Sequence, residues 1–390
     1  MPPVGAVWRN VAGSFSENES KEEGGVRRMI YIVGWIASYS TYLLVALMGS
    51  HGTRLGRWLL IMPMLIFGAI IGFRNSGTDT QLIYEPILYN MLRGIPSPVA
   101  QGWEPGFQLV TKGLLWLTNS EAVSLRLVGV IYVGLLLVFL MRADKVEVAV
   151  LFLYYLPLFV YQHGMNTVRV GLAGALFMLA WQALRRKRAS IFWLLALSST
   201  MFHYSMVIPI LILIFIFSEY KLLSWKTFVA MFAIFAVFSA VVVWREDYFL
   251  TKLKLYSSFE APSSLSAVSR VALICFLSTV FTIDKVPISV RVKTFIGLTV
   301  VTLMFQALVL VSYAGTRMVD LMTLLAPLLL IRQFDLVGRS PSKLFLWSLG
   351  FAGLIGAGFV YRNFATDFDG QVSGTPSPFL PYRTIFDEWP

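Results

Sequence analysis

The chain has 390 residues, of which 57% are hydrophobic and only 14% charged, and its formal net charge is +11. Soluble domains carry about a quarter of their residues as charged side chains, so this composition excludes a water-soluble globular protein. The apolar runs are unbroken and longer than the alternating segments of ~10 residues that form membrane β-barrels. The sequence therefore predicts an all-α, polytopic integral membrane protein.

Cysteine and histidine are scarce, which limits the metal and redox chemistry that the chain can support. Cys275 is the one cysteine, so an intramolecular disulfide is excluded. With His51, His163 and His203 as the three histidines, the composition argues against an all-protein zinc site. We expect no metal ion and no cofactor.

Residues 1–28 form a polar tail of mixed charge that does not look like a signal peptide, and we expect it to be disordered. Region 29–361 is the expected transmembrane helical domain. Crossing the hydrocarbon core takes about 20 apolar residues. The candidate spans, about twelve in all, are 29–48, 58–73, 123–141, 146–161, 167–184, 189–202, 204–217, 227–244, 267–283, 294–311, 317–331 and 344–360.

The segment 189–217 has two interpretations. It is either one long tilted helix or a helical hairpin with His203 at its tip. Pro209 disfavours one regular helix, and a hairpin keeps the alternation of charged loops along the chain coherent. We expect the hairpin.

Basic residues predict the orientation in the membrane. Half of the 32 Lys and Arg residues lie in six short connections on one predicted side, and 185–188 is the densest group. Such loops stay in the cytoplasm, so both termini are expected outside. The long loops 74–122 and 245–266 and the tail 362–390 are then external. Much of the positive charge follows this rule, and we expect no nucleic-acid partner.

Conspicuous polar residues from separate segments gather on the external side of this topology. An arginine at the centre of a span costs about 2.5–3.5 kcal/mol on insertion scales, and a forked guanidinium matches phosphate oxygens. We interpret Arg74, Arg169 and Arg317 as a set that binds phosphate. Taken singly, each also suits an anchor at the membrane interface. Asn166 and Tyr84 are expected to contact other parts of the substrate.

Asp79, Glu104 and His203 are the candidates for a general base. Asp79 follows a Gly-Thr pair and Glu104 precedes a Pro-Gly pair, so each also suits a turn or a helix cap. His203 also suits an interfacial histidine without a chemical role. The sequence leaves the choice among the three open.

These residues fall into short motifs that recur in the same order in one family. The motifs are Arg74-x-x-Gly77-Thr78-Asp79, Glu104-Pro105-Gly106-Phe107, Asn166-x-x-Arg169, Phe202-His203-x-Ser205 and Pro381-Tyr382. Over about residues 29–383 the chain resembles EpsG-type proteins, the Wzy-like polymerases of bacterial exopolysaccharide, capsule and O-antigen assembly. It departs from the family pattern at Thr80 and Val170, where an aromatic residue and a glutamine are common.

The resemblance implies an architecture similar to GT-C-like lipid-linked-sugar polymerases and ligases, in the bacterial inner membrane with the active site facing the periplasm. The implied reaction is a metal-independent glycosyl transfer. A sugar hydroxyl of one undecaprenyl-pyrophosphate-linked repeat unit attacks the anomeric carbon of another, and undecaprenyl pyrophosphate leaves. The arginines would bind the pyrophosphate, and Asp79, Glu104 or His203 would accept the proton. The implied partners are the lipid-linked donor and acceptor, membrane lipid, and a chain-length regulator and flippase of the same pathway.

Two other functions stay open. Another membrane glycosyltransferase with a polyprenyl-linked donor, or an O-antigen ligase, would also place acidic residues in the first external loop. A dependence of the activity on a divalent metal would help to distinguish this alternative from the polymerase. A transporter or flippase predicts polar residues near the bilayer midplane and pseudo-symmetric halves with broken helices, whereas here the midspan positions are apolar and the halves do not repeat.

Overall fold

The computed structural model describes residues 21–50, 53–75, 77, 79–217, 243, 246, 250, 267–365, 379–380 and 382–387. Most of the N-terminal tail, nearly all of the predicted span 227–244 and of the loop 245–266, and much of the C-terminal tail lie outside these residues. So do Thr78 and Pro381 of the sequence motifs.

The described residues form helices and no strand. Seven helical segments are long and apolar enough to cross a membrane: α2 (Lys21–Leu47), α3 (Arg54–Gly72), α7 (Glu121–Arg142), the run Lys145–Asn166, α16 (Ile288–Val309), α17 (Tyr313–Leu336) and α18 (Lys343–Ala365). The run is made of α8 (Lys145–Ala149), η2 (Val150–Tyr155), α9 (Leu156–Tyr161) and η3 (Gln162–Asn166), and both η segments are π-helical turns.

Four further helices occupy predicted spans. They are α10 (Val168–Arg185), α11 (Ala189–Phe202), α12 (Val207–Phe217) and α15 (Val268–Ile283). Every predicted span other than 227–244 therefore overlaps a helix, and the chain is a multi-pass membrane protein. The total of twelve stays a prediction, because 227–244 lies almost wholly outside the described residues.

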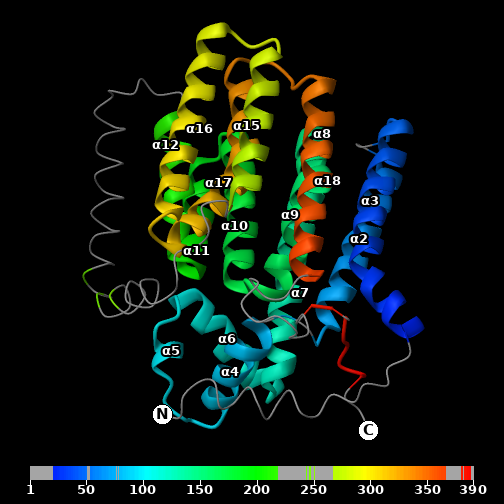
Figure 1. Cartoon of the computed structure of the whole chain (residues 1–390), viewed down its shortest axis with the longest axis vertical. Coiled ribbons are helices and arrows are strands. Elements are labelled where there is room, and N and C mark those ends of the chain that lie inside the picture. Colours follow the sequence, from blue (N-terminus) through cyan, green and yellow to red (C-terminus); the bar gives the residue numbers. More distant parts are fainter. Residues whose placement is uncertain are drawn as a thin grey trace.

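The long helices run side by side, and the short helices α4 (Glu85–Leu92), α5 (Pro98–Gln101) and α6 (Pro105–Thr118) lie together at one end of the bundle (Figure 1). The run Lys145–Asn166 is central, because 94% of its most apolar window is buried, against 22% for α16. It contacts α2, α7, α10 and α18. The core therefore fixes the position of the η3 turn at the end where α4–α6 lie.

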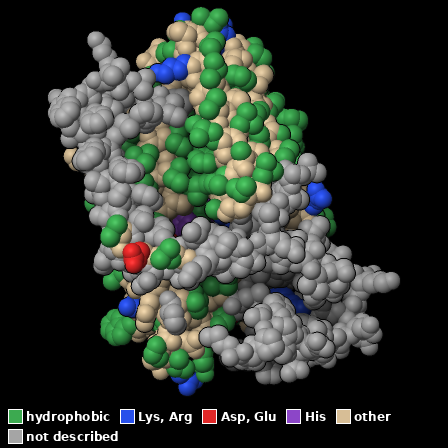
Figure 2. Space-filling view, turned by 60° about the vertical axis from the view of Figure 1, so that its left-hand side comes forward, with side chains coloured by type: hydrophobic (Ala, Val, Ile, Leu, Met, Phe, Trp, Pro, Cys, Tyr) green, Lys and Arg blue, Asp and Glu red, His purple; other side chains and the backbone are tan. Residues whose placement is uncertain are grey.

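Large apolar side chains cover the outside of the bundle. Ile36, Trp58 and Met304 are 62%, 63% and 66% exposed, and Figure 2 shows hydrophobic side chains along the length of the bundle with basic side chains at its upper end. A continuous apolar surface of this extent is unfavourable in water. Lipid tails supply the environment that it requires.

The segment 189–217 contains two helices rather than one. Helix α11 ends at Phe202, and His203 has an extended backbone with φ −157° and ψ 113°. A 3₁₀ turn over Tyr204–Met206 then leads into α12. One extended residue ends the pattern of helical hydrogen bonds, so the break leaves His203 between two helix ends.

The end of the bundle opposite α4–α6 holds a cluster of ion pairs around the buried Glu147. Arg185 Nη1 lies 2.9 Å from both Asp144 and Glu147, and Arg185 Nε lies 2.7 Å from Asp335. Arg186 Nη2 lies 2.8 Å from Glu147, whose side chain is 1% exposed. A buried carboxylate is stable only with such partners. The cluster ties α8, α10 and α17 together, and it uses part of the basic group that the sequence assigns to the cytoplasmic side.

Candidate active site

Segments that are far apart in the chain meet at the end of the bundle where α4–α6 lie (Figure 1). They are the loop after α3 with the π-helical turn η1 (Thr80–Tyr84), the start of α6, the junction of η3 and α10, and the break between α11 and α12. All of the predicted site residues except Arg317 lie on these segments. Arg317 lies in the second turn of α17.

Glu104 joins three of the segments. It occupies the N-cap position of α6, where Pro105 begins the helix, but its side chain makes no cap hydrogen bond. Instead its Oε2 accepts a hydrogen bond from Arg169 Nη1 at 2.8 Å, and its Oε1 lies 3.0 Å from His203 Nδ1. The carboxylate is 0% exposed. The guanidinium of Arg169 and the imidazole of His203 therefore offset the free-energy cost of burying it.

The charge of Glu104 determines which ring nitrogen of His203 carries the proton between them. Burial raises the pKa of Glu104, but Arg169 and His203 outweigh burial and lower that pKa to about 2. An ionised carboxylate can only accept hydrogen bonds, so His203 Nδ1 carries the proton that it donates to Glu104. In a neutral ring, Nε2 is then the acceptor, and no described residue forms a hydrogen bond to it. The His203 side chain is 23% exposed.

Arg169 is held from two sides. Its Nη1 binds Glu104, and its Nε donates to the Tyr84 hydroxyl at 3.2 Å. Tyr84 in turn packs against Trp103 and Phe107, with ring centroids 5.8 Å away in each case. The Arg169 side chain keeps 16% of its surface exposed. The second residue of α10 therefore presents a guanidinium in a fixed position beside the site.

Asp79 and Asn166 lie beside this group. Asn166 Oδ1 accepts a hydrogen bond from the backbone N–H of Asp79 at 2.8 Å. Burial raises the pKa of the Tyr84 hydroxyl, and among charged groups Arg169 opposes this while Asp79 and Glu104 add to it. Asp79 is therefore close enough to Tyr84 for its charge to act there. Asp79 precedes η1 without a side-chain cap bond, so the cap interpretation does not account for it.

Arg74 is buried rather than open to a ligand. Its side chain is 1% exposed, its Nη1 donates to the Gly164 carbonyl, and its Nη2 donates to Thr80 Oγ1 at 3.2 Å. Thr80 Oγ1 donates in turn to the Met165 carbonyl at 2.5 Å. Thr80, a departure from the family pattern, thus links Arg74 to the η3 turn, and the pair anchors the loop that carries Asp79.

A model of the EpsG family matches residues 57–384. The chain belongs to the EpsG family. The match begins in α3, includes every residue of the site described above and ends within the last described segment, 382–387. Membership places the protein among membrane proteins of polysaccharide-polymerase type. No curated protein and no solved structure matched the chain.

In this EpsG-family protein a C-terminal segment, Tyr382–Asp387, holds the loop of Arg74. Arg74 and Thr384 form an isolated antiparallel bridge. The Asn75 N–H donates to the Arg383 carbonyl at 2.7 Å, and the Tyr382 hydroxyl donates to the Ile70 carbonyl at 2.6 Å. Tyr382 belongs to the last of the sequence motifs, but residue spacing gives no sign of this pairing.

Arg126 also contacts this loop, and it is not among the predicted site residues. Its Nε donates to the Arg74 carbonyl at 2.8 Å, and its Nη2 donates to Asn75 Oδ1 at 3.1 Å. An arginine inside the predicted span 123–141 was the available signal, because such residues are costly and need a partner. Arg126 supports the same loop from the side of α7.

Arg317 and His203 are linked to the same buried histidine by their charges. Arg317 and His203 both act electrostatically on His163, which is 6% exposed and stacks on Phe159 with ring centroids 5.0 Å apart. His163 lies in the η3 turn, three residues before Asn166. Among the described residues, no three His, Cys, Asp or Glu side chains are grouped to hold a metal ion.

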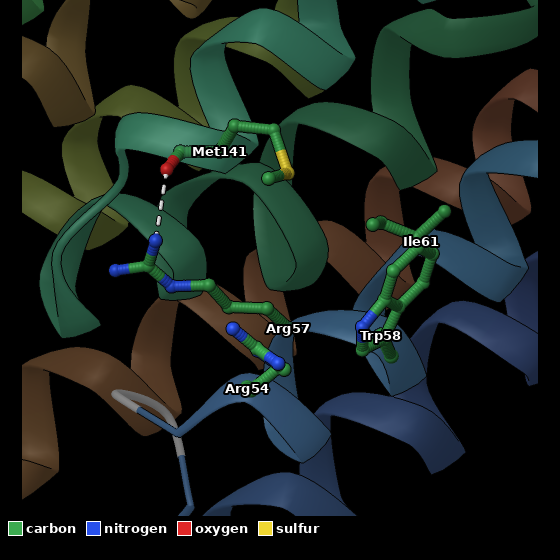
Figure 3. A pocket seen from close by; sticks show the side chains of 5 residues that line it. All are labelled: Arg54, Arg57, Trp58, Ile61 and Met141. Atoms are coloured by element: carbon green, nitrogen blue, oxygen red, sulfur yellow. Dashed lines mark hydrogen bonds between the residues drawn. The ribbon is translucent and has the colours of Figure 1, made fainter.

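A cavity of about 440 Å³ lies at the opposite end of the bundle and contains none of the predicted site residues. It is lined by Arg54, Arg57, Trp58, Ile61 and Met141, from the start of α3 and the end of α7 (Figure 3). The polar contacts around Glu104 therefore lie at the other end of the bundle from this cavity.

Proposed function

We propose that this EpsG-family protein polymerises undecaprenyl-pyrophosphate-linked oligosaccharide repeat units at the outer face of the bacterial inner membrane. The observation that carries the proposal is the pairing of one buried carboxylate, Glu104, with both Arg169 and His203. The pairing brings two side chains together. In this proposal Arg169 is the cation that faces a phosphate leaving group, and His203 is the oriented imidazole that accepts a hydroxyl proton.

The reaction joins two lipid-linked chains. A hydroxyl oxygen of one chain attacks the anomeric carbon of the other, and the bond between that carbon and the pyrophosphate oxygen breaks. The electron pair leaves with undecaprenyl pyrophosphate. The hydroxyl proton passes to His203 Nε2, the acceptor that remains when Nδ1 donates to Glu104. Glu104 is a positioning residue, because it fixes the tautomer and orientation of the ring.

The leaving group requires a positive charge where negative charge develops. Arg169 supplies it from a side chain that is 16% exposed and fixed by Glu104 and Tyr84. Arg317 is the second pyrophosphate ligand in this proposal, since its charge and that of His203 both act on His163. Arg74 is left out, because its guanidinium is buried and bonded to Gly164 and Thr80.

Asp79 is proposed to bind and orient sugar hydroxyls, and the buried Asn166 to hold Asp79 in position for this. Asp79 is half-buried, stands at the end of the loop that Arg74 anchors, and is held through its backbone by Asn166. A carboxylate at the edge of a site suits hydroxyl donors. In this role Asp79 binds the acceptor sugar and does not act as the general base.

Orientation places the site outside the cell in this proposal. The densest basic group, Arg185–Arg188, lies at the other end of the bundle from Glu104. Basic loops are retained in the cytoplasm, so the site then faces the periplasm, where lipid-linked repeat units are to be joined.

The test is polymer formation in cells that express Arg169→Ala or Arg169→Lys, with membrane abundance measured for each. Lysine keeps the charge but cannot bind Glu104 and Tyr84 together as the guanidinium does. Both variants should insert normally and leave single lipid-linked units. Lys112→Ala, at an exposed basic residue of α6, is the matched control and should make normal polymer. Normal polymer from both Arg169 variants would reject the proposal.

A further inference from the structure

The cavity at the end of α3 combines two arginines with an apolar surface. Arg54 and Arg57 lie one turn apart in the first turns of α3, and Figure 3 shows their side chains beside each other. Arg57 Nη1 donates to the Met141 carbonyl of α7 at 3.3 Å, which directs this guanidinium toward the neighbouring helix. None of the lining residues is acidic, so the cavity itself provides no counter-charge.

The surface below the arginines is apolar and faces outward. Trp58, Met62 and Leu65 are 63%, 60% and 55% exposed. Their spacing puts them on one face of α3, with Arg54 four residues before Trp58 and therefore directly above it. This face has charge at the end of the bundle and apolar side chains along its length. A phospholipid has the complementary distribution, with a phosphate at the membrane surface and acyl chains below.

We infer that this cavity is a binding site for the headgroup of an anionic phospholipid, with its phosphate between Arg54 and Arg57 and its acyl chains along Trp58 and Met62. Forked guanidinium donors match phosphate oxygens, and basic pockets between transmembrane helices bind anionic headgroups. A zwitterionic headgroup fits less well, because its ammonium would have no carboxylate in the lining of the cavity. The inference concerns the opposite end of the bundle from Glu104, so it does not depend on the proposed polymerase reaction.

The test is native mass spectrometry of the full chain in detergent, titrated with phosphatidylglycerol. Each arginine removed should weaken binding about fivefold, so Arg54→Gln/Arg57→Gln should raise the Kd of the tightest site roughly 25-fold. Lys293→Gln/Lys343→Gln makes the same change in charge at the same end of the bundle, on α16 and α18, and should change this Kd less than twofold. Arg54→Lys/Arg57→Lys keeps the charge without the forked donors and should fall between the wild type and the Gln variant.

Three results would overturn the inference. The first is an equal loss of phosphatidylglycerol binding in Arg54→Gln/Arg57→Gln and in the control Lys293→Gln/Lys343→Gln. That result would show that binding depends on the general surface charge and not on this cavity. The second is equal binding of phosphatidylcholine, which would remove the preference for an anionic headgroup. The third is displacement of the lipid by inorganic phosphate at the same concentration, which would indicate a site for a free anion. Thermal unfolding of each variant shows whether a lost site reflects lost folding.

Discussion

The Nδ1 atom of His203 lies 3.0 Å from Oε1 of Glu104, although the two residues are 99 positions apart. The other oxygen of the same carboxylate binds Arg169. One buried anion therefore fixes a titratable ring and a guanidinium at the same time, and its removal should affect both.

Glu104→Gln should reduce polymerisation by up to about 10²–10⁴-fold, the usual contribution of the general base that Glu104 positions. The amide keeps the size of the side chain, but it no longer requires the proton on His203 Nδ1 and leaves the Arg169 charge without its counter-ion. Conversion of lipid-linked repeat units to polymer in isolated membranes measures the effect. Activity near the wild-type level, at equal abundance, would contradict the role given to Glu104.

The stabilising effect of Glu104 should depend on pH in the acid range. The pKa of Glu104 is about 2 in the folded protein, below its ordinary value of 4.5. Its charged form therefore favours the folded state fully above pH 4.5, and this contribution is lost as pH falls toward 2. Thermal unfolding of wild type and Glu104→Gln in detergent should show a stability difference that narrows over this interval. A constant difference would show that ionisation of Glu104 does not contribute.

Gly77→Ala should displace the loop that carries Asp79. Gly77 has φ +118°, and a Cβ atom there would lie 2.7 Å from the Met165 carbonyl oxygen. Strain of this kind costs about 1–3 kcal/mol, and we expect loss of polymer as well as lower thermal stability. Gly94→Ala is the matched control, because Gly94 has φ +69° and nothing within 4 Å of a Cβ. If Gly77→Ala and Gly94→Ala change polymer yield and thermal stability equally, the contact with Met165 does not position the loop.

Tyr382→Phe should weaken the attachment of the C-terminal segment. The change removes the hydrogen bond from the Tyr382 hydroxyl to the Ile70 carbonyl, at a cost of about 1 kcal/mol. Tyr39→Phe removes comparable bonds to Leu153 and Gly350 away from the site. Polymer yield and unfolding temperature should both be measured. For the same loss of stability, Tyr382→Phe should make less polymer than Tyr39→Phe. Equal polymer yields in the two variants would show that the segment is only a structural support.

The helices were predictable from the sequence because the length and apolar composition of each run are enough to indicate a helix in the membrane or in the core. The break at His203 followed from Pro209 and the charge pattern, and the structure places two helices there. The role of Glu104 was not predictable in the same way. The Pro-Gly pair after it gives its N-cap position correctly, but local sequence contains no information about partners 65 and 99 residues away.

Arg74 illustrates the opposite difficulty. An arginine after a span, near a Gly-Thr-Asp motif, indicates a phosphate ligand when only residue types are considered. The structure instead buries its guanidinium against the Gly164 carbonyl and Thr80. That contact depends on the π-helical turn η3 and on the approach of two distant segments, neither of which follows from residue spacing.

The charged cluster at the far end of the bundle has a consequence for synthesis of the chain. Arg185 and Asp335 are 150 residues apart. At about 5–20 residues per second, the ribosome needs roughly 8 to 30 s to reach Asp335 after Arg185. During that time Asp144 and Glu147 are the carboxylates already available to Arg185. The ion pair between α10 and α17 therefore forms late in biogenesis, when Arg185 already has Asp144 and Glu147 as partners.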